Sequence, residues 1–226
     1  NLFTNSFNSK VFVPISTYSN SKEKLKSFDI VIYAASLGKI FRNKISNFPK
    51  SKFLFAKQKH VSNFNKKLLE ISTKKRIGIS WKSTNKDTGN DKSLNLELLL
   101  PIIKNKNFTF INIQYGDTES TIKKFNNKFN LKIHNIDGID LFNDFDSMSG
   151  LIQNLDLFIS VSSSTAHLAA ALGVETWIIK PKNHVLLHYW NYYKNISLWY
   201  PKVRLFPHKK NWMDTISAIK KEVIVQ

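Results

Sequence analysis

The 226-residue sequence contains no cysteine and no long apolar run, and its six histidines are scattered. Without cysteine, disulfides, a thiolate nucleophile and cysteine-ligated metals are excluded. Because no histidine lies in a close cluster with aspartate or glutamate, we expect no metal site. No apolar stretch approaches the ~20 residues of a membrane span, and the first ten residues lack the basic-then-apolar order of a signal peptide. These absences predict a cytoplasmic protein.

The sequence has few acidic residues and only three arginines, so its net charge of +18 comes almost entirely from lysine. Scattered lysine usually forms a solvated surface, and no nucleic-acid-recognition motif accompanies it, so we expect no specific nucleic-acid partner. The alternative, nucleic-acid binding through charge alone, predicts a steep loss of affinity with added salt. Residues 1–75 carry +12 of this charge. Such a surface favours an anionic glycan, a phosphorylated acceptor or the inner membrane surface as partner.

Short apolar runs alternate with longer amphipathic ones along the chain. Three β-rich runs predict a small sheet unit within residues 1–75. From residue 76 to residue 226 strands alternate with helices, which predicts an α/β fold with a Rossmann-like parallel sheet and helices on both faces, because parallel neighbours need crossover connections. The expected strands are 10–16, 28–36, 51–57, 76–81, 108–114, 131–136, 155–161 and 175–180, and the expected helices are 94–105, 118–129, 144–155, 165–173 and 211–224.

Ligands of such sheets bind at the carboxyl ends of the strands, so the loops there are candidate sites. The first, residues 81–93, is long and polar, and Lys82 or Lys92 would meet an anion as a point charge. Its alternative is a solvated loop whose Ser93 caps the next helix. Both interpretations stay open from sequence.

The second loop, residues 114–120, contains Gly116, which permits a sharp turn. Thr118 is placed to cap the following helix. Asp117 and Glu119 could accept hydrogen bonds from a ribose, or the segment is an ordinary turn.

The third loop places four hydroxyl residues between an apolar strand and an alanine-rich helix that ends at Gly173. At a helix N-terminus, unpaired N–H groups and the positive end of the dipole favour an anion. Small side chains would let a diphosphate approach the backbone. A capping run is the alternative, and the helix histidine is by default a surface or core residue. The candidate residues are Ser162, Ser163, Ser164, Thr165 and His167.

The aromatic run at residues 188–201 also has two interpretations. Its rings could stack on a base or sugar, or they could seal a domain junction. From the residues alone, both interpretations stay open for Tyr189 and Trp190.

Several segments resemble one family in the same order: GISW, DKSLNLELLLPII, FINIQYGD, DSMSGLIQNLDLFISVSSSTAHLAAALGVETWIIKP and WYPKVRLF. Residues 76–206 are similar to the C-terminal, nucleotide-sugar-binding domain of heptosyltransferase-like (family 9-type) GT-B glycosyltransferases, especially bacterial forms attached to tetratricopeptide repeats. SSTAHLAAALG is the most specific part. Residues 28–57 resemble the end of the family's N-terminal domain more weakly. The resemblance also places Trp199 and Tyr200 at the family's interdomain motif, which implies that these two rings seal the domain junction.

The resemblance implies metal-independent, inverting transfer of a sugar from a nucleotide-diphosphate sugar to a surface carbohydrate, as in lipopolysaccharide biosynthesis, with no further cofactor. A leaving diphosphate would be stabilised by a helix dipole, hydroxyls and lysines. Carried over by position, the family's loop falls on Ser162, Ser163 and Ser164, its helix histidine on His167 and its phosphate-directed lysine on Lys92; Lys82 lies after the first strand, Glu119 near the ribose and Met148 near the base.

The sequence departs from the family pattern at two positions. Ser162 stands where the family has aspartate, and Glu175 stands where it has proline. Only 75 residues precede Arg76, so we expect a shortened N-terminal part, or one whose missing pieces lie on another chain, and we identify no residue as the general base. The alternative is therefore a catalytically degenerate nucleotide- or glycan-binding module of the same fold.

Overall fold

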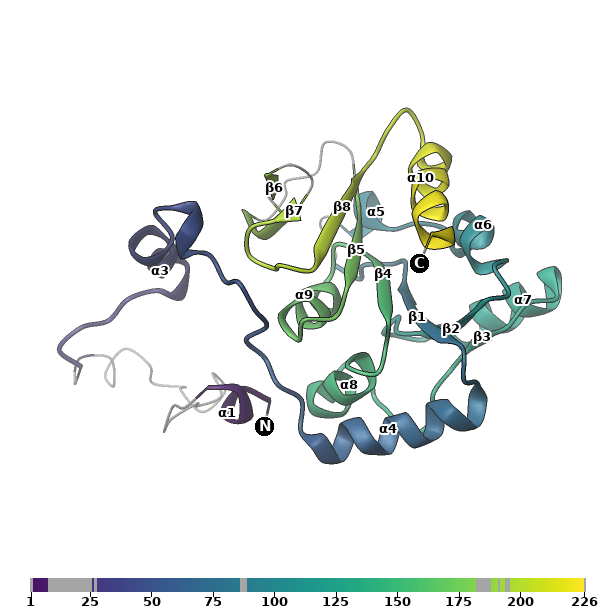
Figure 1. The fold of residues 1–226 in the computed structure, drawn as a ribbon, viewed down its shortest axis with the longest axis horizontal. Helices are drawn as coiled ribbons and strands as arrows, with labels where there is room; N and C mark the ends of the chain where they lie inside the picture. Colours follow the sequence, from purple (N-terminus) through teal and green to yellow (C-terminus); the bar gives the residue numbers. More distant parts are fainter. Residues whose placement is uncertain are drawn as a thin grey trace.

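The computed structural model describes residues 2–7, 26, 28–85, 89–181, 188–190, 192–193 and 196–225. The described chain forms an eight-stranded sheet in the order β3-β2-β1-β4-β5-β8-β7-β6 (Figure 1). The strands from β3 to β8 in this order are parallel, and β7 and β6 extend the sheet antiparallel. Their bounds are β1 Lys75–Ser80, β2 Phe108–Asn112, β3 Ile133–His134, β4 Leu157–Val161, β5 Thr176–Lys180, β6 Tyr192–Tyr193, β7 Ile196–Ser197 and β8 Val203–Pro207.

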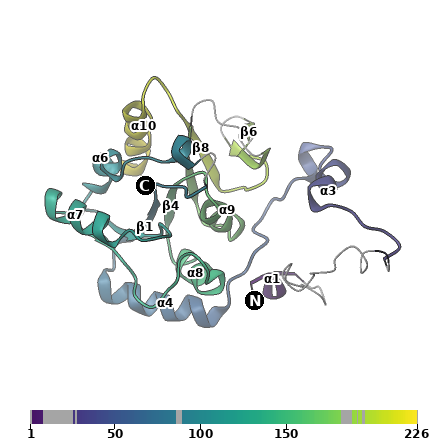
Figure 2. The same ribbon diagram turned by 180° about the vertical axis from the view of Figure 1, so that it is seen from behind.

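Helices cover both faces of the sheet (Figures 1 and 2). One core cluster contains side chains of α4, α8 and α9, and the other contains side chains of α6, α7 and α10. The predicted Rossmann-like α/β fold is therefore confirmed. The helix bounds are α1 Leu2–Ser6, α3 Ala34–Phe41, α4 Gln58–Ile71, α5 Gly89–Lys92, α6 Leu100–Ile103, α7 Glu119–Phe129, α8 Phe145–Ile152, α9 Ser164–Ala171 and α10 Trp212–Ile224, with 3-10 turns η2 Ile45–Asn47, η3 Leu96–Leu99 and η4 His188–Trp190.

The central strand β4 shows why its sequence is apolar throughout. Leu157, Ile159 and Val161 enter one core, whereas Phe158 enters the other. A strand that is covered on both faces has a continuous apolar sequence, whereas a strand with one solvated face alternates apolar and polar residues. This run ends at the carboxyl end of the strand, where the four hydroxyl residues begin.

Helix α4, which precedes the predicted boundary at residue 76, packs against α8. Phe64 and Leu68 of α4 are buried in the same core as α8. The helices approach closely at Gly150, where an added Cβ would lie 2.5 Å from the Cβ of His60. A larger residue would push the two helices apart, so glycine permits this packing.

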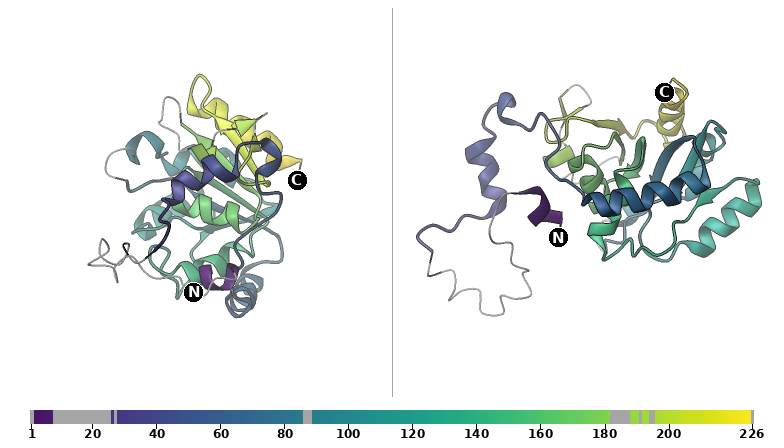
Figure 3. Two further views of the ribbon diagram at one scale, coloured as in Figure 1. Left: turned by 90° about the vertical axis from the view of Figure 1, so that its left-hand side faces the viewer. Right: turned by 60° about the horizontal axis from the view of Figure 1, so that its bottom comes forward.

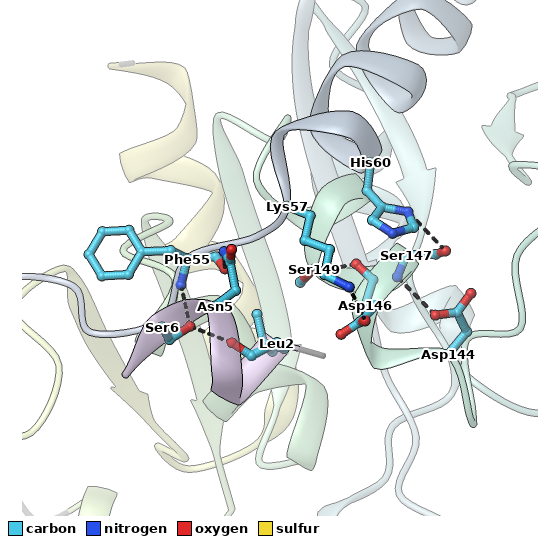
Figure 4. A network of polar contacts seen from close by, with 10 residues as sticks. All are labelled: Leu2, Asn5, Ser6, Phe55, Lys57, His60, Asp144, Asp146, Ser147 and Ser149. Atoms are coloured by element: carbon cyan, nitrogen blue, oxygen red, sulfur yellow. Dashed lines mark hydrogen bonds and ion pairs between the residues drawn. The ribbon is translucent and has the colours of Figure 1, made fainter. Parts of the chain in front are cut away.

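Polar contacts join α1 to the segment before α4, and join that segment to α8 (Figure 4). The Asn5 side chain donates to the Phe55 carbonyl at 2.8 Å, and the Phe55 N–H donates to Ser6 Oγ at 2.8 Å. Lys57 forms an ion pair with Asp146 of α8 at 3.3 Å. These contacts position α1 beside α8 although the two lie far apart in sequence.

The strands predicted at residues 28–36 and 51–57 are wrong, and residues 10–16 lie outside the described part. Residues 28–33 form no strand, and α3 follows them. Within the described ranges no strand lies beside this segment to pair with it, and Ile30 is 76% exposed. The right-hand view of Figure 3 shows α3 apart from the sheet. In the described chain, no helix is long and apolar enough to cross a membrane.

Candidate functional site

A cavity of about 510 Å³ lies at the carboxyl ends of β1, β2 and β4. Strand β1 pairs with β2 on one side and with β4 on the other, so this is the point at which the strand order reverses. Open α/β sheets bind ligands at such a switch point. The lining residues are Ser83, Thr84, Asn85, Lys92, Tyr115, Leu141, Phe142, Phe145, Met148, Ser162, Ser163, Ser164, Thr165 and His167.

The four hydroxyl residues that open α9 have different roles. Ser163 is the N-cap, and its Oγ accepts from the Ala166 N–H at 3.2 Å. Ser162 Oγ instead accepts from Nε1 of Trp190 at 2.8 Å. Thr165 is buried, and Ser164 is exposed. Because the first N–H groups of a helix have no intrahelical acceptor, those of Ser164 and Thr165 bring positive potential to the cavity.

His167 lies one turn into α9 and is surrounded by aromatic rings. It stacks on Trp190 with ring centroids 4.1 Å apart and planes 20° apart, and it meets Tyr189 edge-on at 5.4 Å. Its Nδ1 lies 3.0 Å from the Tyr200 hydroxyl. Burial, with a smaller contribution from Tyr189, raises the pKa of Tyr200, so its hydroxyl keeps the proton. The aromatic run therefore holds His167, which lines the cavity, and its own rings lie behind that lining.

Trp199 and Tyr200 also contact the N-terminal segment. Trp199 meets Phe48 edge-on with centroids 5.1 Å apart and lies under the guanidinium of Arg42 at 5.8 Å. Tyr200 stacks on Phe53 at 6.0 Å. These rings hold the segment before α4 against the C-terminal unit.

The loop after β1 brings Lys92 to the cavity, on the one-turn helix α5. Ser93 Oγ donates to the Gly89 carbonyl at 2.6 Å and accepts from the Ser83 N–H at 3.0 Å. The alternative in which Ser93 caps the next helix is wrong, because Asn95 caps it. Ser93 closes the loop on itself, which fixes the backbone that carries Lys92.

Gln114 joins the ends of β1 and β2, and the sequence analysis missed this role. Its Oε1 accepts from Ser80 Oγ at 2.9 Å and from the N–H groups of Trp81 at 2.9 Å and Lys82 at 2.7 Å. Gln114 is only 1% exposed. The one sequence signal is an amide side chain two residues after a buried strand. Lys82 is held here by its backbone, and its side chain is exposed.

The loop after β2 makes the predicted turn at Gly116, whose φ is +87°. Thr118 occupies the N-cap of α7, but its hydroxyl accepts from the Asn112 amide at 3.2 Å and makes no cap bond, so the predicted capping role is wrong. Glu119 is exposed and lines a neighbouring depression of about 430 Å³ with Asp117. The candidate residues Lys92, Met148, Ser162, Ser163, Ser164, Thr165 and His167 line one cavity, and Lys82 and Glu119 lie outside its lining.

The chemistry of the cavity favours an anion. Lys92 and the start of α9 supply positive potential, and none of the described lining residues is an aspartate or glutamate. Phe142 and Phe145, both exposed, and the half-buried Tyr115 add aromatic surface. Within the described chain, no group of three or more histidine, cysteine, aspartate and glutamate residues could hold a metal.

No family model matches the sequence. Protein FlbA of Caulobacter vibrioides is 27% identical over 187 residues, which cover 80% of this chain and 31% of FlbA. The structure is similar to a glycosyl transferase of family 9 from Veillonella parvula DSM 2008, with a TM-score of 0.53 and 9% identity, over 76% of this chain and 51% of that one. It is also similar to ADP-heptose LPS heptosyltransferase II of E. coli, with a TM-score of 0.50 and 12% identity, over 82% of this chain and 58% of that one.

These likenesses bear on the fold. The chain spans less than two thirds of the length of each of these three proteins. Together with the parallel sheet and its covering helices, they show that the chain has the α/β fold of GT-B-like glycosyltransferases.

Proposed function

We propose that this chain binds a nucleotide-diphosphate sugar and transfers the sugar, without a metal, to a glycan acceptor. The observation that carries the proposal is the cavity at the switch point, which the N-terminus of α9 and Lys92 both line. The fold shared with glycosyltransferases supports it. The E. coli neighbour is named for ADP-heptose and LPS, which makes a sugar of this kind and a surface carbohydrate the first donor and acceptor to test.

The diphosphate would lie against the start of α9. The N–H groups of Ser164 and Thr165 and the ammonium of Lys92 are suited to phosphate oxygens. When the bond to the sugar breaks, negative charge grows on the diphosphate, and preorganised donors stabilise that charge most. Met148 and Phe145 provide the apolar part of the cavity that suits a base.

Sugar transfer also needs a general base for the acceptor hydroxyl. No described residue of the cavity lining carries a carboxylate, so a carboxylate base of the kind that the resembled family uses would come from outside this lining. The basic residues 1–75 are the proposed region for an anionic glycan or membrane surface. The net positive charge of these residues favours such partners through electrostatic attraction, without a specific binding motif.

A second candidate function is a binding module that retains the nucleotide site without transfer. Ser162 favours it, because its hydroxyl is bound to Trp190 and it stands where the resembled family has a carboxylate. Such a module would bind the nucleotide and leave donor sugars intact.

The test is isothermal titration calorimetry with a panel of nucleoside diphosphates in EDTA. We expect one nucleotide to bind and Lys92→Ala to weaken it by about 10- to 100-fold, because a hydrogen bond to a charged group contributes ~1.5–3 kcal/mol. Lys104→Ala, at an exposed lysine after α6, is the matched control and should bind like the wild type. Donor hydrolysis and transfer assays then separate enzyme from module, and binding of no nucleotide would refute both.

A further inference from the structure

We propose that Tyr200 is a positioning residue: its hydroxyl donates to Nδ1 of His167 and so fixes the imidazole with its proton on Nε2. In this form His167 presents an N–H donor, as an anion requires, from a ring that lines the cavity. The proposal rests on the proposed function, because the anion in question is the diphosphate. It assigns a role to a residue that does not itself line the cavity.

The geometry fixes the ring of His167 in place. Nδ1 lies 3.0 Å from the Tyr200 hydroxyl, and Tyr200 is 6% exposed. The stacking of His167 on Trp190, at 4.1 Å and 20°, restricts rotation of the imidazole. Trp190 is fully buried and donates to Ser162 Oγ at 2.8 Å. Ser162 thus affects His167 indirectly, because it holds the Trp190 ring on which His167 stacks.

The direction of the hydrogen bond follows from the partner that the cavity favours. A neutral tyrosine hydroxyl can donate or accept, and a neutral imidazole carries its proton on one of two nitrogens. Burial raises the pKa of Tyr200, so the hydroxyl retains its proton and can donate. If His167 donated from Nδ1 instead, Nε2 would carry a lone pair, which repels an anion. Donation from Tyr200 gives the Nε2–H form that attracts one.

The first experiment measures the tautomer directly in the protein without nucleotide. Two-dimensional ¹⁵N–¹H NMR of the imidazole, assigned by its loss in His167→Gln, should show an unprotonated Nδ1 and a protonated Nε2. Tyr200→Phe, which keeps the ring and removes the hydroxyl, should give a mixture of both tautomers. Tyr33→Phe, at a tyrosine that is 83% exposed, is the matched control and should leave the signals unchanged. A protonated Nδ1 in the wild type, or an unchanged tautomer in Tyr200→Phe, would overturn the proposal.

A second readout separates positioning from a purely structural role. We expect Tyr200→Phe to weaken binding of the nucleoside diphosphate by up to about tenfold, the effect of one neutral hydrogen bond, and to leave binding of the corresponding nucleoside unchanged. An equal loss for both ligands would mean that Tyr200 only shapes the cavity. If the wild type binds no nucleotide, the proposed function fails, whereas the tautomer measured in the free protein still decides whether Tyr200 sets it.

Discussion

Replacing Gln114 with alanine removes the acceptor of three hydrogen bonds that join the ends of β1 and β2. The donors are Ser80 Oγ and the N–H groups of Trp81 and Lys82. The donors of Ser80 and Trp81 are buried, whereas the N–H of Lys82 is partly buried and can reach water. A buried donor left without a partner costs about 1–3 kcal/mol. Two such donors predict a loss of about 2–6 kcal/mol in the free energy of unfolding.

The assay is urea unfolding followed by circular dichroism, with the free energy extrapolated to water. Gln153→Ala is the matched control, because the buried Oε1 of Gln153 has no hydrogen-bond partner in the described structure. We expect that variant to stay within about 0.5 kcal/mol of the wild type. Hydrogen exchange should also become faster at the amides of Trp81 and Lys82 in Gln114→Ala. A loss no larger than that of Gln153→Ala would refute the role assigned to Gln114.

Two further substitutions test the packing that supports the cavity. Gly150→Ala should destabilise the protein by about 1–3 kcal/mol in the same assay, because the added Cβ would lie 2.5 Å from His60. In the control Gly38→Ala the added Cβ would lie 3.8 Å from its nearest atom, so this variant should be neutral or stabilising. Equal effects of the two substitutions would contradict the close approach of α4 and α8. Asp144→Ala should cost ~1 kcal/mol at pH 7, because Asp144 caps α8. Hydrogen bonds from Ser147, first from its side chain and then from its backbone, lower the pKa of Asp144. The stabilisation by Asp144 is therefore complete above the unfolded carboxyl pKa of about 4, and it is lost as the pH falls through the lower pKa of the folded state. A stability difference between variant and wild type that persists in acid would contradict this role.

Periodicity and composition predicted the parts of the fold that depend on local sequence. The apolar run of β4 predicted a strand covered on both faces, and both cores contain its side chains. Hydroxyl residues followed by alanines predicted the start of α9, and Gly173, with a φ of +76°, lies just after this helix, as expected. These features placed most of the candidate residues at the carboxyl ends of the strands. They succeeded because neighbouring residues supply the determining interactions.

The features that sequence could not predict depend on partners far along the chain. Ser162 and Trp190 are joined by a hydrogen bond across 28 positions, and no local pattern indicates it. Gln114 likewise acts on a loop more than thirty residues earlier. The apolar run at residues 28–33 has strand composition, yet a strand also needs a neighbour, and the described chain places none there. Composition alone cannot supply that neighbour.

The most direct test of the central claim is a crystal structure of the protein with the nucleoside diphosphate that binds best. We predict that the diphosphate lies at the start of α9, with oxygens about 3 Å from the N–H groups of Ser164 and Thr165 and from Nζ of Lys92. A nucleotide bound elsewhere on the molecule, or a cavity that stays empty at saturating nucleotide, would contradict the account.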